Sequence, residues 1–239
     1  MQVYLGPLGD LRLVPSFPEL AITPEREINV FKALSGKKIL QASPRAHRTW
    51  EWELPYTDAT EAEWLNELSG LGVVGPYYLY TSAAAVENLA PQQLQVGGSG
   101  AVAGRRILTT GDSGVTQSRV IPVKPSTAYT LSTITNGTGT LTRRLINAAG
   151  TQLSTAALAA GTSGTRVSVN FTTTADTAGI TLTPTPGIGQ IRLTEGTHTG
   201  FMPGDGAPEV YVSPLERTAQ IVQSGTVLSA FRARVEEVG

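Results

Sequence analysis

The chain has no cysteine, only two histidines, and three tryptophans that all lie before Leu89. Without cysteine, neither a disulfide framework nor a thiolate metal site can form. The fold therefore cannot depend on the redox compartment, which suits a protein made in a cytoplasm and used outside it. No apolar run approaches the ~20 residues that span a bilayer, and the first residues show no secretion signal. We expect a soluble protein.

The chain also lacks an excess of charge of either sign. Its formal net charge of -1 predicts neither a nucleic-acid binder nor a polybasic membrane binder. The distribution is uneven, because residues 89–205 carry eight basic and four acidic residues, a net charge of +4. That leaves ten basic and fifteen acidic residues, -5, in the flanks. The middle is rich in Thr, Gly, Ala and Ser. It therefore differs in composition from the two flanks.

Residues 120–195 show the pattern of a self-contained β-sandwich. Short Thr- and Val-rich runs recur at a spacing of roughly 8–12 residues between turn residues. In the run 166–173, Val167, Val169 and Phe171 share one face and polar residues share the other, which predicts a half-buried strand. Residues 120–132 predict two strands joined by a Pro/Ser turn.

The flanks predict a second β domain with a single helix. Residues 27–34 and 39–40 predict two strands, and residues 45–54 predict an amphipathic strand whose tryptophans enter the core. Residues 227–238 predict a long final strand with an apolar and a charged face. Thr60 with Glu63 predicts a capping box at the start of the helix. Its apolar stripe consists of Trp64, Leu65, Leu68 and Leu71.

Two Gly- and Pro-dense segments, residues 82–100 and 200–208, separate the middle of the chain from the flanks, which differ from it in composition. The predicted fold is mainly β: a discontinuous β-sandwich-type domain with one helix, formed by residues 1–88 and 206–239, and an inserted β-sandwich of the jelly-roll type, residues 89–205. Insertion succeeds where an exposed loop brings the ends of the guest domain close together. The alternative is two domains in tandem, with residues 206–239 in the second.

The flanks resemble the distal tail protein of tailed bacteriophages, a ring-forming component that joins the tail tube to the tail-tip apparatus. The resemblance lies in the order of the opening residues Val-Tyr-Leu-Gly, the early strand pair, the tryptophan strand, the helix and the last strand. It implies a non-enzymatic virion protein that is assembled in the host cytoplasm. The implied partners are other copies of the chain in a ring, as a hexamer that matches the tail tube, the tail tube protein and other tail-tip proteins.

The middle resembles the inserted carbohydrate-binding jelly roll of such tail proteins, through residues 123–132, 166–172 and 189–196. The resemblance implies an aid to binding host cell-wall glycan. Such modules often have a tryptophan near the start of the penultimate strands, where this chain has Arg166. Tyr129 and Phe201 are the only plausible exposed aromatics in the middle. The candidate glycan-binding residues are therefore Tyr129, Arg166 and Phe201.

One short motif and one set of acidic residues are candidates for chemistry. Residues 111–114, Gly-Asp-Ser-Gly, are similar to the nucleophile motif of trypsin-like proteases but lack the Gly-Pro that follows it there. A nucleophilic serine also needs an oriented base, and only His47 and His198 are available, so we predict a turn. Asp112, Asp176 and Asp205 carry the hard oxygen atoms that calcium prefers, but no spacing selects them. We predict no enzyme activity, no cofactor and no metal site.

Four arginines of the middle, Arg105, Arg106, Arg143 and Arg144, have two interpretations. They line an anion site, or they are solvated strand residues and contacts to the acidic flank. Two further functions stay open beside the tail-tip role. One is a free-standing carbohydrate-binding protein, which usually presents aromatic platforms. The other is an enzyme, for which the chain offers no paired acids and no nucleophile–base set.

Overall fold

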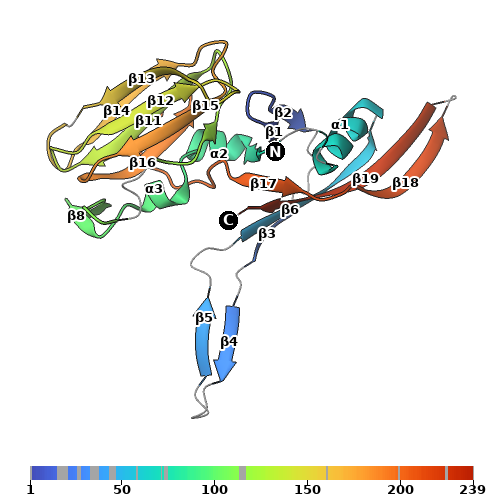
Figure 1. The fold of residues 1–239 in the computed structure, drawn as a ribbon, viewed down its shortest axis with the longest axis horizontal. Helices are drawn as coiled ribbons and strands as arrows, with labels where there is room; N and C mark the ends of the chain where they lie inside the picture. Colours follow the sequence, from blue (N-terminus) through green and yellow to red (C-terminus); the bar gives the residue numbers. More distant parts are fainter. Residues whose placement is uncertain are drawn as a thin grey trace. The chain divides into compact units, whose positions relative to one another are not determined.

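A computed structural model describes residues 2–14, 21–25, 28–32, 38–42, 47–57, 59–70, 72, 75–112, 117–159, 161–198, 200–223 and 226–238. The chain divides into two compact units. Unit 1 consists of residue 1 and residues 15–75 and 209–239, and unit 2 of residues 2–14 and 76–208. Both are built from antiparallel strands (Figure 1), which confirms the mainly β class. The unit that holds the sandwich also contains residues 2–14 and 76–88, which the sequence assigned to the flanking domain. The predicted boundary of the inserted domain at residues 89–205 stays a prediction.

Unit 1 is an antiparallel sheet around two long strands. β6 (His47–Thr57) and β19 (Thr226–Glu237) pair with each other, and β3 (Ala21–Glu25) pairs with the other edge of β6. β17 (Glu209–Val212) pairs with the C-terminal end of β19, and β18 (Glu216–Gln223) pairs with its N-terminal part. The tryptophan strand and the final strand predicted from the sequence therefore form the centre of this sheet.

The two faces of this sheet differ as the alternation predicts. In the register of β6 and β19, Val235 lies opposite Trp50 and Ala233 opposite Trp52, and all four side chains are buried. Of the residues between them, Arg234 is exposed and Glu51 is half-buried. Because successive side chains of a strand point to opposite faces, one face is apolar and the other charged.

Unit 1 also contains a helix and a hairpin. α1 (Ala59–Ser69) buries Trp64, Leu65 and Leu68, as predicted. It begins at Ala59, so the N-cap prediction at Thr60 is wrong: that residue already lies inside the first turn. Leu71 lies outside the described residues. The hairpin of β4 (Ile28–Lys32) and β5 (Lys38–Ala42) forms a two-stranded sheet of its own.

Unit 2 begins with three strands and two short helices. β1 (Val3–Pro7) pairs with β2 (Arg12–Val14) and with β7 (Tyr77–Thr81), which is buried along its whole length. α2 (Ser82–Glu87) follows β7 directly, and α3 (Gln92–Val96) comes next in the chain. Neither was predicted, because helices of six and five residues are too short to show a helical period. The hydroxyl of Thr81 caps α2 by accepting from the backbone N–H of Ala84 (3.1 Å).

The rest of unit 2 is the sandwich, defined here as strands β10 to β16. One sheet has the order β10-β15-β12-β13 and the other β14-β11-β16. The strands are β10 (Ile121–Pro122), β11 (Ala128–Thr135), β12 (Leu141–Ile146), β13 (Gln152–Leu158), β14 (Arg166–Thr172), β15 (Gly179–Pro184) and β16 (Ile188–Glu195). A small hairpin of β8 (Gly100–Val102) and β9 (Arg105–Ile107) precedes it. β13 and this hairpin were not predicted.

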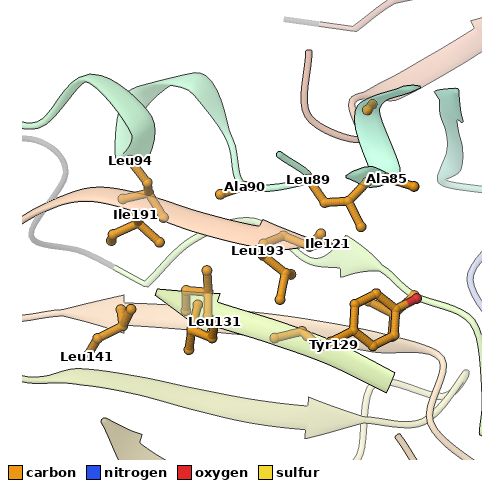
Figure 2. Packing of buried hydrophobic residues seen from close by; sticks show 14 of the residues in the cluster. Ala85, Leu89, Ala90, Leu94, Ile121, Tyr129, Leu131, Leu141, Ile191 and Leu193 are labelled. Carbon is orange, nitrogen blue, oxygen red and sulfur yellow. The ribbon is translucent and has the colours of Figure 1, made fainter. Parts of the chain in front are cut away.

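The core of unit 2 lies between the two sheets and continues to α2 and α3. Figure 2 shows Leu89 and Leu94 close to Ile191 and Leu193 of β16, with Leu131 of β11 on the far side of that strand. Side chains of the helices therefore complete the core beside the last strand of the three-stranded sheet. No helix in the described parts of the chain is long and apolar enough to cross a membrane.

Asn88 closes the free edge of β16. It is 0% exposed, its Nδ2 donates to the carbonyl of Ile191 (2.9 Å), and its Oδ1 accepts from the N–H of Leu193 (3.0 Å). The N–H of Leu89 donates to the carbonyl of Leu193 (2.8 Å). Further along the same edge, a Cβ at Gly189 would lie 2.1 Å from the carbonyl oxygen of Arg106. Only glycine allows the backbones to approach this closely.

Candidate functional site

Two of the three predicted glycan-binding residues lie together on the outer face of the three-stranded sheet. The guanidinium carbon of Arg166 lies 5.3 Å from the ring centroid of Phe201. Nη1 of Arg166 donates to the hydroxyl of Ser132 (3.1 Å) and to the carbonyl of Gln190 (3.2 Å), and Nη2 donates to Oε1 of Gln190 (3.2 Å). These contacts hold the guanidinium in a fixed position beside the aromatic ring.

The backbone at this position is irregular. The register of β11 and β16 shifts between Ser132 and Ile134, and Gln190 has a φ of 48°. A non-glycine residue in the left-handed region stores strain, and such strain together with a β-bulge is a frequent feature of functional sites. The bulge places both the carbonyl and the side chain of Gln190 against Arg166.

Positive charge concentrates around Arg166. Burial, followed by the positive charges of Arg105 and Arg192, lowers the pKa of Arg166 to about 10. The group therefore stays charged at neutral pH. Arg192 donates to the carbonyls of Glu87 (2.7 Å), Val86 (2.8 Å) and Gly200. It thereby satisfies carbonyls at the end of α2, where a cation is favourable, and is not free to bind a ligand.

The same face of β14 presents polar groups. Ser168, Asn170 and Thr172 are exposed, while Val167, Val169 and Phe171 are half-buried on the other face, as the alternation predicts. The hydroxyl of Thr130 donates to Oδ1 of Asn170 (2.9 Å). The face offers hydroxyl, amide and guanidinium groups beside one aromatic ring, and such groups can hydrogen-bond a sugar or an acidic group.

Tyr129 does not belong to this face, and the expectation that it is an exposed aromatic is wrong. It is 1% exposed and belongs to the core, where its ring stacks on Phe171 with centroids 6.0 Å apart. Tyr129 and Leu131 both point to the inner side of β11. Tyr129 lies close to the turn residues that precede the strand, so its inward position was not recognised in the sequence. A buried ring cannot serve as a platform for a sugar.

A cluster that the sequence did not predict surrounds the hydroxyl of Tyr129. Nζ of Lys124 lies 3.0 Å from Oε1 of Glu195 and 3.9 Å from the ring centroid of Tyr4, which stacks on Tyr80 (5.1 Å). The hydroxyls of Tyr80 and Tyr129 donate to Glu195 (3.4 and 3.5 Å). Burial raises the pKa of both tyrosines. The cluster joins β1 and β7 to the sandwich, and its residues are too far apart in sequence to form a recognisable motif.

The candidate motifs for chemistry do not assemble into a site. The carboxylate of Asp112 accepts from the N–H and hydroxyl of Thr109 (2.6 and 2.9 Å) and from the N–H of Ser99 (3.1 Å). It braces a turn, while Ser113 lies outside the described residues. Asp176 and Asp205 are exposed. Within the described ranges, no three His, Cys, Asp or Glu residues come together as a group that could hold a metal ion.

The four arginines for which two interpretations were given differ in burial. Arg105, Arg106 and Arg144 are exposed, whereas Arg143 is half-buried and shares the inner face of β12 with Leu141 and Leu145. The signal was present in the sequence, because Leu, Arg and Leu recur at every second residue. The comparisons with known proteins add no candidate: no family model matches the chain, and no curated protein matches it.

Proposed function

We propose that this protein is a structural, non-enzymatic component of a bacteriophage tail tip. Copies of the chain form a ring, most simply a hexamer, that joins the tail tube to the host-adhesion apparatus. The sandwich contacts the glycan of the host cell wall. The resemblance of the flanks to distal tail proteins supports the ring, and the polar face at Arg166 and Phe201 supports the contact with glycan.

The observation that carries the ring is the isolated hairpin of unit 1. Within the described residues, β4 and β5 pair only with each other, and Val30 on β4 is 58% exposed. A two-stranded hairpin without a covering layer is at best marginally stable in water. A contact with a neighbouring copy would supply the missing layer.

The edges of the unit 1 sheet support the same proposal. In the part of the chain that the structure describes, β3 pairs only with β6, and β18 pairs only with β19. Ile22 on β3 is exposed. An open edge strand presents unpaired backbone groups that another chain can use. Because β3 and β18 are different surfaces, a contact between them is heterologous, and such contacts generate rings.

The test is the mass of the assembly in solution, together with imaging of the particles. We expect a ring of about six times the 25.1 kDa of one chain. The substitution Val30→Lys should shift the population toward smaller species, because it places a charge in the proposed contact. Val86→Lys is the matched control, since Val86 is also an exposed valine but lies on α2 of unit 2.

Two results would contradict the proposal. A wild-type protein that stays monomeric at every concentration and is absent from virions would exclude the tail-tip role. Equal effects of Val30→Lys and Val86→Lys would exclude a specific role of the hairpin. A monomer that nevertheless binds glycan through Arg166 would favour the second candidate, a free-standing carbohydrate-binding protein.

A further inference from the structure

Arg143 is an arginine on the inner face of a β-sandwich. It shares this face with Leu141 and Leu145, which belong to the buried core. In the register of the four-stranded sheet it lies opposite Leu182 of β15 on one side and Ala156 of β13 on the other. Leu182 is fully buried. A cation thus occupies a position that the strand pattern assigns to an apolar side chain.

Among the described residues, the guanidinium of Arg143 has an aromatic neighbour but no hydrogen-bond acceptor. Its carbon lies 3.8 Å from the ring centroid of Phe171, whose ring also stacks on Tyr129. Nε and Nη1 of Arg143 are buried, and neither has a hydrogen-bond partner among the described residues. Burial lowers the pKa of this arginine. A buried donor without an acceptor is unfavourable, so the arrangement calls for an acceptor from outside the chain.

The inner face remains accessible at this margin of the sandwich. β13 and β14 are the edge strands of the two sheets and are in contact. β13 is exposed along nearly its whole length, and its inward positions beside Arg143 carry the small side chains of Ser154 and Ala156. Phe171 is itself only half-buried. Arg143 is itself half-buried, and Nη2 is not among the buried atoms without a partner, so the side chain is not sealed from solvent at this margin.

We propose that Arg143, supported by Phe171, binds an oxyanion, a carboxylate or a phosphate carried by an acidic polymer of the host cell wall. The proposal rests on the binding role proposed for the sandwich and does not depend on ring assembly. A guanidinium presents parallel N–H groups that match the two oxygens of such an anion. The ring of Phe171 is already in contact with Arg143 and Tyr129, so recognition depends on charge rather than on stacking of a sugar.

The structure gives the reason for preferring a ligand to a structural role. A guanidinium that only stabilises the fold is normally paired with a carboxylate or with carbonyl groups, as Arg48 and Arg192 are. Residues that break the local pattern without compensation are typical of functional sites. The net charge of +4 over residues 89–205 attracts the same class of ligand.

The first experiment titrates the full chain with three defined probes and follows the arginine Nε–Hε signals by NMR. The probes are trigalacturonate, which carries carboxylates, a glycerol phosphate oligomer, which carries phosphodiesters, and neutral maltotriose. We expect one or both acidic probes to shift the Arg143 signal and maltotriose to leave it unchanged. The two acidic probes decide which anion is preferred.

The matched control is the next residue on the same strand. Arg144 has the same charge but is exposed, and Nη1 donates to Oε1 of Gln117 (3.3 Å). Arg143→Gln should weaken binding of the acidic probe at least about tenfold, the loss expected for one charge-assisted contact, and Arg144→Gln should change it less than about twofold. Equal losses would mean general attraction by the positive surface. Binding unaffected by Arg143→Gln, or no binding of either acidic probe, would overturn the proposal.

A second variant separates binding from folding. Arg143→Met removes the unpaired donors and keeps an apolar contact with Phe171. We expect Tm to rise by about 2–4 °C without ligand, and the acidic probe to raise Tm of the wild type but not of the variant. A fall in Tm would show that Arg143 stabilises the fold and would overturn the proposal. The ring of the variant should keep its mass, so failure here is distinguishable from failure of the tail-tip role.

Discussion

The arginines of the unit 1 sheet and those of the sandwich have different partners. In the sheet of unit 1, Arg232 lies 3.2 Å from Glu53, Arg234 lies 3.5 Å from Glu51, and Arg48 lies 2.9 Å from Glu237. In the sandwich of unit 2, Arg143 and Arg166 lie over aromatic rings, and Arg166 donates to hydroxyl and amide oxygens. Outside the sandwich, Arg12 of unit 2 lies 2.9 Å from Asp10, so the contrast is between the unit 1 sheet and the sandwich. Lys124 with Glu195 is a carboxylate pair of unit 2, and it lies at the junction with β1 and β7.

The sheet edges also differ, because the edge of β16 in the sandwich is closed and two edges of the unit 1 sheet are open in the described part of the chain. The sandwich closes the edge of β16 with the amide of Asn88, whereas β3 and β18 of unit 1 have no second partner strand among the described residues. Paired charges and open edges suit association through the backbone. In the sandwich, Arg143 and Arg166 have no carboxylate partner among the described residues, which suits the binding of an acidic ligand. The proposed function accordingly places assembly in unit 1 and ligand contact in the sandwich.

The largest effect is expected when the closed edge is opened by Asn88→Ala. The substitution leaves the carbonyl of Ile191 and the N–H groups of Ala90 and Leu193 buried without their partners. Each such group costs about 1–3 kcal/mol, so we expect a loss of about 3–5 kcal/mol in the stability of the sandwich. Amide hydrogen exchange measures it directly, through faster exchange at Leu193 and Ala90.

Asn170→Ala is the control for this prediction. Asn170 lies on the exposed face of β14 and accepts one hydrogen bond, from Thr130. We expect less than about 1 kcal/mol. Similar exchange rates in both variants would mean that Asn88 does not close the edge.

A smaller effect is expected in unit 1 when the most buried pair is broken by Arg48→Ala. The side chains of Arg48 and Glu237 are 10% and 22% exposed, so removal of the arginine leaves a poorly solvated carboxylate. Loss of one partner of a fully buried pair costs about 3–5 kcal/mol, and we expect about 2 kcal/mol here because solvent reaches the pair. All three tryptophans lie in unit 1, so urea unfolding followed by tryptophan fluorescence reports on this unit.

Arg232→Ala tests whether exposure sets the effect. Arg232 and Glu53 are 51% and 69% exposed, and exposed pairs contribute about 0–1 kcal/mol. We expect less than about 0.5 kcal/mol, and this small term should vanish in high salt. A loss as large as that of Arg48→Ala would show that burial does not explain the difference.

Three of the predicted strands, β6, β14 and β19, were identified from an alternation of apolar and polar residues. In β14 and the described part of β19 the buried and exposed residues follow the predicted order, because one face of each strand is covered and the other is not. In β6 the order holds for the tryptophans but not for Thr49, which is buried on the face predicted to be exposed. β13 carries Ser, Thr and Ala and is exposed on both faces, so its sequence has no apolar period. α2 and α3 form because Ala85 and Leu94 pack into the core beside β16, and such tertiary contacts cannot be derived from five or six residues.

The candidate site was predictable only in part. Arg166 and Phe201 were identified, but their contact depends on the bulge at Gln190, which no local pattern indicates. Tyr129 was assigned to the surface although its alternation with Leu131 places it in the core. Arg143 had the same inward period, and its charge argued against following the pattern. A charged residue at a core position was therefore the most informative deviation in the sequence.

The smallest effect concerns Asp112. Its charge, like the charges of Arg143 and Arg166, is held by neutral groups. Hydrogen bonds from the backbone of Thr109 and then of Ser99 lower the pKa of Asp112 to about 2 from its ordinary value of 3.8. A lowered pKa means that the ionised form stabilises the turn. The contribution is fully present above the ordinary pKa and is lost as the pH falls through about 2.

NMR titration of the Asp112 carboxyl carbon should therefore give a midpoint near 2, with the amide signals of Ser99 and Thr109 changing at the same pH. Asp112→Asn keeps one acceptor and should abolish this dependence while leaving the sandwich folded. An ordinary midpoint near 3.8 would mean that neutral donors do not hold this charge. In that case, Arg143 and Arg166, but not Asp112, would be charged groups held by neutral partners.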